Sequence, residues 1–164
     1  MNIGVDFSAA ADGKVFPRSL GTFLFNPCFH AVALFRLSVL FYRSHMEPLA
    51  KIVWYINRML YHVDIDYKAQ LAPGFRLIHG LGVIIGGGVV SDGPLTVYQG
   101  VTIGGSHGRH RDDGHGGVFW QPHFGNDVIV YTNSCIFGPI YIGDDAIVKA
   151  ARVVTKDVEP GERV

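Results

Sequence analysis

Aliphatic residues recur at every sixth position over most of the chain that follows Tyr61. Thirteen such positions fall into two runs, and twelve of them hold Leu, Ile or Val. The first run is Ile65, Leu71, Leu77, Val83, Val89, Leu95 and Val101, and the second is Phe124, Val130, Ile136, Ile142, Val148 and Val154. Neither the period of a helix nor the alternation of a strand gives a spacing of six. The repeat predicts a mainly β solenoid, a parallel β-helix in which three six-residue sides make one coil.

The two runs are separated by a polar, glycine-rich segment at about residues 106–123, which contains "HGRHRDDGHGGVFWQPH". Winding this segment into the solenoid would bury its charges, so we expect it to leave the coil as an extruded loop. The predicted β-helix domain therefore spans residues 63–164 and carries this loop. Long loops on a regular scaffold are often functional, because the scaffold holds both of their ends.

Residues 1–62 contain long aliphatic and aromatic segments with few glycines and are predicted to form an N-terminal helical segment. Residues 26–45 and 47–63 read as two helices, with Pro48 in the first turn of the second, where proline is tolerated. Arg36 and Arg43 are seven residues apart and share a face, which we interpret as a solvated stripe. The many aromatic residues of these helices leave a second possibility open, peripheral association with a membrane surface.

Composition narrows the classes of function. Lys plus Arg and Asp plus Glu each number 14, so the formal net charge is zero and no nucleic-acid partner is indicated. The N-terminus lacks the basic and apolar regions of a signal peptide, and the apolar stretch 31–42 is too short to cross a bilayer. Cys28 and Cys135 lie in segments of different character and are expected to be reduced thiols. These features predict a cytoplasmic protein.

The segments "FHAVALFR", "VDI" at 63–65, "QGVTIGG" at 99–105 and "IGDDAIVKAARVVTKDVEPG" resemble the hexapeptide-repeat acyltransferases. Within that group the chain is most similar to the serine acetyltransferases and the related polysaccharide O-acetyltransferases, over about residues 26–164. The resemblance implies a left-handed coil, acetyl-CoA as co-substrate, no metal, and a homotrimer with active sites between neighbouring prisms. Handedness comes from the resemblance, because periodicity does not show it.

The resemblance also implies a catalytic pair. The base of this family is a histidine oriented by an aspartate fifteen residues earlier, and here Asp64 precedes His79 by that offset. In a three-sided coil this offset can bring both residues near one edge on neighbouring rungs, about 4.8 Å apart. His79 would take the proton of an acceptor hydroxyl as it attacks the thioester, and backbone N–H groups at Gly104 and Gly105 would hold the oxyanion. A turn histidine that only satisfies a local carbonyl is the alternative.

Lys149 and Lys156 lie on the last coil, where the family binds the nucleotide end of CoA. Their charge would suit its phosphates, although solvated surface lysines are an equally good interpretation.

The chain departs from the serine enzymes on the acceptor side. Ile78 precedes His79 where those enzymes usually carry aspartate, and Gln121 stands where their second active-site histidine precedes a proline. Glutamine orients substrates but is no base, and His123 is a candidate replacement. The family's Asp-Pro acceptor motif is not recognisable within residues 12–26. We therefore predict an acetyl-CoA-dependent O-acetyltransferase acting on a sugar of a bacterial surface polysaccharide, with serine O-acetyltransferase as the alternative.

Two further classes stay open. The γ-type carbonic anhydrases share this fold and bind zinc through histidines, and the loop contains His107, His110 and His115. A glycine-rich loop supplies little of the rigid support that a zinc site needs. A non-catalytic trimeric scaffold is the other possibility, against which the Asp64 and His79 pattern argues.

Overall fold

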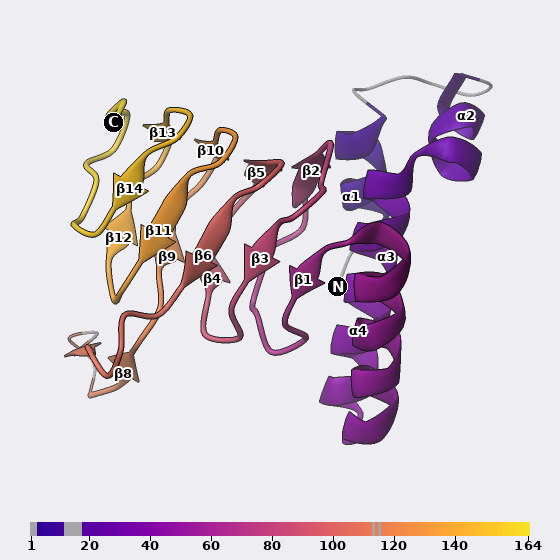
Figure 1. The fold of residues 1–164 in the computed structure, drawn as a ribbon, viewed down its shortest axis with the longest axis horizontal. Helices are drawn as coiled ribbons and strands as arrows, with labels where there is room; N and C mark the ends of the chain where they lie inside the picture. Colours follow the sequence, from indigo (N-terminus) through magenta and orange to yellow (C-terminus); the bar gives the residue numbers. More distant parts are fainter. Residues whose placement is uncertain (1–2, 12–17, 113, 115) are drawn as a thin grey trace.

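The computed structural model describes residues 3–11, 18–112, 114 and 116–164. Four helices stand at one end of the molecule, and the rest of the chain winds away from them as a stack of three-sided coils (Figure 1). The structure is a left-handed parallel β-helix with an N-terminal helical segment, so the predicted fold class is confirmed.

The helices are α1 (Ile3–Ala10), α2 (Arg18–Phe25), α3 (Pro27–Arg43) and α4 (Glu47–Tyr61). The Asn26 side chain caps α3 by accepting hydrogen bonds from the backbone N–H groups of Cys28 and Phe29, and Pro27 occupies the first turn. Helix α4 ends at His62, which adopts a left-handed conformation with φ of 54°. The two helices predicted from sequence are therefore present, with α3 and α4 packed together.

Three parallel sheets form the sides of the prism. The five-stranded face has the order β1 (Asp64–Ile65), β3 (Ile84–Ile85), β6 (Thr102–Gly104), β11 (Cys135–Phe137) and β14 (Val153–Val154). The four-stranded face has the order β13 (Ile147–Val148), β10 (Val128–Val130), β5 (Leu95–Tyr98) and β2 (Arg76–Ile78). The three-stranded face has the order β12 (Tyr141–Ile142), β9 (His123–Phe124) and β4 (Val90–Ser91).

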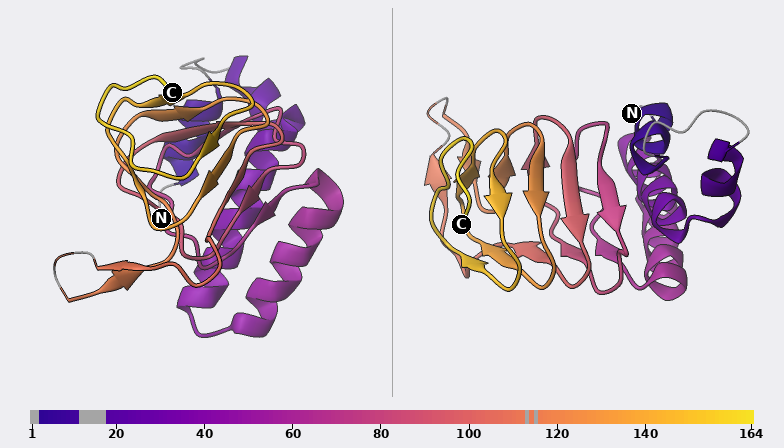
Figure 2. Two further views of the ribbon diagram at one scale, coloured as in Figure 1. Left: turned by 60° about the vertical axis from the view of Figure 1, so that its left-hand side comes forward. Right: turned by 90° about the horizontal axis from the view of Figure 1, so that it is seen from above.

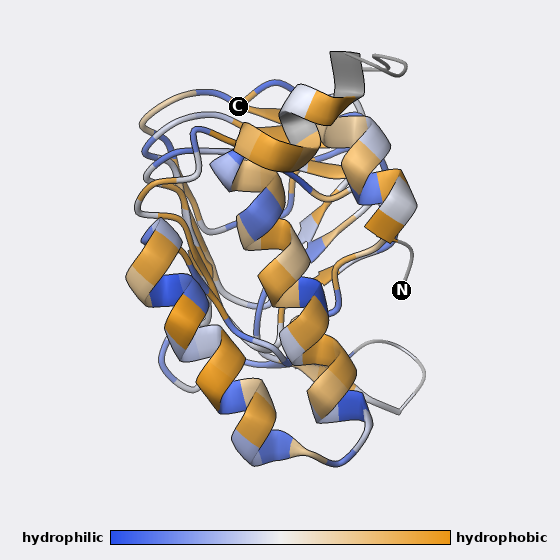
Figure 3. Ribbon diagram, turned by 90° about the vertical axis from the view of Figure 1, so that its right-hand side faces the viewer, coloured by the Kyte–Doolittle hydropathy of each residue, from blue (hydrophilic) through white to orange (hydrophobic). Residues whose placement is uncertain are grey.

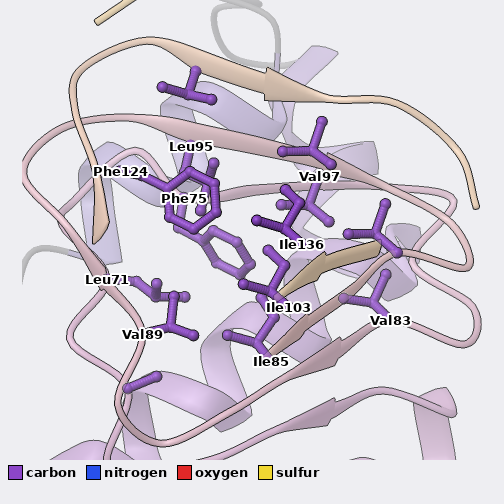
Figure 4. Packing of buried hydrophobic residues seen from close by; sticks show 14 of the residues in the cluster. Leu71, Phe75, Val83, Ile85, Val89, Leu95, Val97, Ile103, Phe124 and Ile136 are labelled. Carbon is purple, nitrogen blue, oxygen red and sulfur yellow. The ribbon is translucent and has the colours of Figure 1, made fainter. Parts of the chain in front are cut away.

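The interior of the prism is filled by aliphatic and aromatic side chains from all three faces (Figure 4). All thirteen positions of the six-residue repeat are buried. Every side except that of Val154 also buries a residue two positions away, as the pairs Val83 with Ile85 and Leu95 with Val97 show, because alternate residues of a strand face the same way. The core is therefore about twice as rich in inward positions as the repeat alone predicts.

The repeat is not in one continuous register. Ile65 pairs with Ile85 and Leu77 with Val97, twenty residues apart, whereas Ile85 pairs with Ile103, eighteen residues apart. The first coil therefore contains two extra residues. The segment between Leu77 and Ile85 is common to these pairings, so the extra residues lie in the turn that begins at His79.

Arg36 is buried, and our interpretation of it as part of a solvated stripe is wrong. Its guanidinium forms an ion pair with Asp6, with Nε 2.7 Å from Oδ2, and also donates to the carbonyl oxygens of Leu71 and Ala72. Asp6 additionally accepts from the backbone N–H of Gly74. This cluster fastens α1 and α3 to the first coil. The spacing of Arg36 and Arg43 misled us because the partner of Arg36 lies thirty residues earlier in the chain.

The segment between β6 and β9 leaves the coil and forms an antiparallel hairpin of β7 (Arg111–Asp112) and β8 (Val118–Phe119), visible as the projecting strand pair in Figure 2. The Arg111 guanidinium binds the carboxylate of Asp157 at 2.6 Å and lies over the ring of Tyr141. The hairpin is thereby tied to the last coil. No helix in the described part of the chain is long and apolar enough to span a membrane.

Candidate functional site

His79 occupies the lengthened turn that joins the four-stranded face to the five-stranded face. It adopts a positive φ of 60°, and Gly80 and Gly82 in the same turn also have positive φ. The backbone N–H of Gly82 donates to the carbonyl of His62, which fixes this turn beside the end of α4. The imidazole is exposed and forms no hydrogen bond within the described residues. A free ring nitrogen on a firmly held backbone suits a base that meets its substrate from solvent.

A cavity of about 190 Å³ lies beside His79, between this turn and the ends of α3 and α4. Its wall includes Cys28, Leu60, Tyr61, Val63 and Leu81, and it contains no carboxylate and no lysine or arginine. The Cys28 thiol approaches the backbone of the turn. Burial raises the pKa of this thiol, against the smaller opposing effect of a hydrogen bond from the His79 backbone. Cys28 is therefore a neutral wall residue at neutral pH.

Asp64 lies on β1, in the part of the chain against which the His79 turn packs. Its carboxylate accepts a hydrogen bond from Trp54 Nε1 at 2.9 Å and forms an ion pair with Arg58, whose Nη1 is 3.0 Å away. Both donors belong to α4. The hydrogen bond that we expected between Asp64 and a ring nitrogen of His79 is not among the interactions of the described residues. The backbone N–H of Asp64 donates to the carbonyl of Val83, four residues after His79, but α4 holds the carboxylate.

Gln121 lies at the corner between the five-stranded and three-stranded faces. Its Oε1 accepts from the backbone N–H of Gly88 at 3.1 Å, and a Cβ at Gly86 would collide with its amide. Gly104 and Gly105 lie at this same corner, because a Cβ at Gly105 would come within 3.7 Å of Gln121 Cγ. A Cβ added at Gly104 would meet no atom within 4 Å. This corner therefore combines Gln121 with the two glycines, but in a single chain it is a different edge from that of His79.

His123 lies on the outer side of β9. Its Nε2 is 2.9 Å from Asp92 Oδ1, and its ring lies 5.5 Å from that of Tyr141. Gln121 and His123 are thus separate: the first contacts a glycine turn, and the second forms a histidine–carboxylate pair on the three-stranded face.

Lys149 and Lys156 are both exposed on the last coils. Lys149 Nζ donates to the carbonyl of Arg163 at 3.0 Å, which leaves further N–H groups for a ligand. Lys149 lies at the edge between the four-stranded and five-stranded faces, as His79 does. Lys156 lies at the edge between the five-stranded and three-stranded faces, as Gln121 does. The two lysines do not form one cluster in a single chain.

Sequence reasoning missed the contacts made by Trp54 and Arg58. They are four residues apart on α4 and so lie on one side of that helix, which was a usable signal that a common partner exists. Nothing in the sequence indicated that this partner is Asp64.

The structure gives no support to a zinc site among the residues it describes, where no three His, Cys, Asp or Glu side chains group as ligands. The His110 ring lies 4.9 Å from that of Trp120. His115, a member of the histidine set considered above, lies outside the described residues, as do residues 12–17 of the segment searched for the acceptor motif.

The three-sided coil, the exposed histidine turn and the hairpin that leaves the third coil define a left-handed β-helix transferase. No family model matches the sequence. The serine acetyltransferase of Helicobacter pylori is 30% identical over 138 residues, which cover 84% of this chain and 77% of that protein. The chain belongs to the serine acetyltransferase family.

Solved structures agree with this assignment. A serine acetyltransferase of Neisseria gonorrhoeae in complex with serine matches 99% of this chain and 64% of its own, with a TM-score of 0.85 and 29% identity. One from Brucella abortus in complex with coenzyme A matches 96% of this chain and 61% of its own, with a TM-score of 0.83 and 26% identity. The chain spans about half the length of some curated relatives, for example 54% of a serine acetyltransferase from Synechococcus elongatus.

Proposed function

We propose that the protein is an acetyl-CoA-dependent O-acetyltransferase in which His79 is the general base. The observation that carries this proposal is the exposed imidazole of His79, held on a strained turn beside a partly open cavity. An acceptor hydroxyl attacks the thioester carbonyl carbon while a His79 ring nitrogen takes its proton. The C–S bond then breaks, and the proton passes to the departing CoA thiolate.

Asp64 supports the base from a distance in this proposal. Its carboxylate is paired with Arg58, and its backbone N–H donates to the carbonyl of Val83, so Asp64 helps to position the segment that follows His79. Trp54 and Arg58 fix the position of that carboxylate. Backbone N–H groups at Gly104 and Gly105 are proposed for the oxyanion, and Lys149 and Lys156 for the phosphates of CoA.

The comparisons favour L-serine as the acceptor over the polysaccharide sugar that we predicted. Several matching curated relatives and solved structures are serine acetyltransferases, and one of the latter was solved with serine bound. L-Serine is therefore the first acceptor to test.

A hydroxyl compound without an amino-acid head group, such as a sugar, is the second candidate. The wall of the cavity beside His79 has no carboxylate to pair with an α-ammonium group, and Ile78 adds none. An unpaired ammonium or carboxylate is costly to remove from water. An uncharged acceptor does not meet this cost.

A homotrimer would complete the site. His79 and the Gln121 corner lie on different edges of one prism, and the five-stranded face runs between these edges. Its outer side exposes Ile84 and Val153, the latter at 71%. Packing such flanks around a threefold axis would cover apolar surface and bring the His79 edge of one copy toward the Gln121 edge of the next.

Release of the CoA thiol from acetyl-CoA, followed with a thiol-reactive dye, tests the proposal. The acceptors are L-serine and a panel of nucleotide sugars and oligosaccharides. We expect turnover with one class and a loss of about 10²- to 10⁴-fold in His79→Ala, with His110→Ala on the hairpin as the matched control. Equal turnover by the parent protein and His79→Ala would refute His79 as the base, whereas no turnover by the parent would favour a non-catalytic scaffold. Turnover of sugars without L-serine would establish the second candidate.

The quaternary proposal has its own measurement. Light scattering after size-exclusion chromatography should give about three times the 18.0 kDa of one chain. A monomeric protein that turns over acetyl-CoA would contradict the shared site.

A further inference from the structure

A cavity of about 370 Å³ lies between the end of α3 and the first coil. Its wall includes Arg43, the last residue of α3, together with Lys68 and Gln70, which follow β1. The other lining residues are Val39, Tyr42, Tyr67, Ala69 and Gly87. Figure 3 looks onto this end of the molecule, with the turn that joins α3 to α4 at the bottom. Two cations therefore line one cavity whose wall contains no carboxylate.

Neither of these cations is neutralised by an acid. The side chains of Arg43 and Lys68 form no hydrogen bond or ion pair with any described residue. By contrast, Arg36, Lys51 and Arg58 on the same two helices each bind a carboxylate. The dipole of α3 favours a cation at Arg43, but it does not account for Lys68. Like charges on one wall repel each other, and a bound anion would remove that repulsion.

Two tyrosine rings hold the ammonium group of Lys68 at the cavity. Its Nζ lies 5.9 Å from the ring centroid of Tyr42 and 5.9 Å from that of Tyr67. The two ring centroids are 5.3 Å apart, and both residues line the cavity. The Tyr67 hydroxyl is fixed in turn by Glu47, whose Oε1 is 3.1 Å away. An ammonium group held by ring faces keeps its N–H donors for a ligand.

The nearest carboxylates are engaged elsewhere. Glu47 binds Lys51, with Oε1 3.3 Å from Nζ, in addition to the Tyr67 hydroxyl. Asp66 accepts from the backbone N–H of Lys68 and lines a different cavity, beside α4. No carboxylate within the cavity thus competes with an anionic ligand for the two cations.

A second cavity of about 370 Å³ adjoins the first. The two share four lining residues, Val39, Arg43, Ala69 and Gln70. In the second cavity, Ser91 Oγ accepts from the backbone N–H of Ala72 at 2.9 Å, which leaves the hydroxyl hydrogen for a ligand. Asp92 Oδ1 lies 2.9 Å from His123 Nε2, and Oδ2 is left to accept. Arg36 also lines this cavity, but its charge is balanced by Asp6. These groups suit the hydroxyls of a ligand rather than a second anionic group.

We propose that the two adjoining cavities, which we call the α3 groove, bind a phosphate monoester of a sugar or other polyol. The phosphate contacts Arg43 and Lys68, and the hydroxylated part lies toward Gln70, Ser91 and Asp92. A phosphate monoester carries a charge of about −1.5 to −2 at neutral pH, which balances two cations. Arginine and lysine both bind phosphate through charge-assisted hydrogen bonds.

The α3 groove is separate from the site proposed for CoA. It lies at the helical end of the molecule, whereas Lys149 and Lys156 lie on the last coils. Each of its two cavities is also of a size typical for small-molecule ligands, about 300–1,000 Å³. An inorganic phosphate ion would leave most of this space empty, so we expect the ester to bind more tightly.

Thermal unfolding followed by scanning fluorimetry tests the inference on the full chain. The probes are glucose 6-phosphate and glycerol 3-phosphate, compared with glucose, glycerol, inorganic phosphate and succinate at equal ionic strength. A ligand that binds only the folded protein raises the thermal midpoint as its concentration increases. We expect this rise with at least one of the two esters, weaker as salt is raised, and none with glucose or glycerol.

Arg43→Gln/Lys68→Gln should weaken binding of the ester about tenfold or more, because both charged contacts to the phosphate are lost. The matched control is Arg109→Gln/Arg152→Gln, which removes two exposed cations outside the α3 groove and should bind as the parent does. Circular dichroism checks that both double variants fold. Arg43→Gln alone, with a smaller expected loss, serves if the double variant does not fold.

No stabilisation by either ester, or equal affinity in the parent and the Arg43 and Lys68 variants, would overturn the inference. Equal stabilisation by succinate would overturn the choice of phosphate, and equal affinity for inorganic phosphate would overturn the role of the hydroxylated part. Displacement of the ester by CoA would assign the groove to CoA instead. None of these measurements involves acetyl transfer, so failure here and failure of the proposed function are distinguishable.

Discussion

The ion pair between Asp6 and Arg36 gives a sharp test of how the helical segment is held to the coil. Both side chains are buried, with residue exposures of 1% and 5%. The two oxygens of Asp6 accept from Arg36 Nε and Nη2, and Oδ1 also accepts from the backbone of Gly74. In Asp6→Ala the guanidinium would stay buried with only carbonyl partners, and the Gly74 N–H would lose its acceptor.

Breaking a buried pair from one side costs about 3–5 kcal/mol, because an uncompensated charge is left in the interior. Unfolding entropy is about 2.1 cal/mol/K per residue, or about 0.3 kcal/mol/K for a chain of this length. The thermal midpoint of Asp6→Ala should therefore fall by about 10–15 °C.

Differential scanning calorimetry at fixed protein concentration measures this change. Asp6→Ala/Arg36→Met, which removes both charges, should recover most of the loss, since an apolar replacement of a buried pair is often neutral. Lys51→Met, which breaks the exposed pair with Glu47, should shift the midpoint by less than about 2 °C. An Asp6→Ala midpoint within about 2 °C of the parent, or a double variant as unstable as the single one, would refute the reasoning.

Three further results are expected. Burial, and then the hydrogen bond to Glu47, raise the pKa of Tyr67 from 10 to about 12. The free energy of unfolding, measured by chemical denaturation, should therefore fall as the pH rises from 10 to 12. This fall should be smaller in Tyr67→Phe. Partial burial acts to raise the pKa of Asp157, but hydrogen bonds from Arg111 and a backbone N–H lower it overall. The hairpin should thus stay docked on the last coil above pH 3.8, the ordinary pKa of an aspartate, and its docking should weaken as the pH falls further. Arg111→Ala should increase proteolysis of the hairpin at neutral pH. Unchanged cleavage would contradict a role of the Arg111–Asp157 ion pair in docking. Gly143→Ala would place a Cβ 2.5 Å from the backbone nitrogen of the next rung, so denaturation should show a loss of about 3 kcal/mol, and a stable variant would disprove the close approach.

The coil could be predicted from sequence because the inward positions are set by a six-residue repeat. The lengthened turn at His79 could not. Each side has two inward positions that are two residues apart, so a two-residue insertion moves the repeat from one inward position to the other. Val83 and Val89 therefore continue the pattern of Leu77 in the sequence, although Leu77 pairs with Val97 in the structure.

The site was harder to predict for a different reason. The offset between Asp64 and His79 predicted a contact between their side chains, but a side chain also responds to the elements that pack over it. Trp54 and Arg58 come from α4, and no spacing within the coil reports their presence. Arg36 shows the same limit, since the location of Asp6 depends on how α1 folds back onto the first coil.

The hairpin has a consequence for how the solenoid comes apart. In repeat proteins each unit normally touches only its neighbours, so terminal units can fray one at a time. Here the hairpin emerges from the third rung, lies over Tyr141 on the fourth and pairs with Asp157 beyond the fifth. The hairpin thus holds rungs three to five together, and these rungs must unfold as one unit at the C-terminal end.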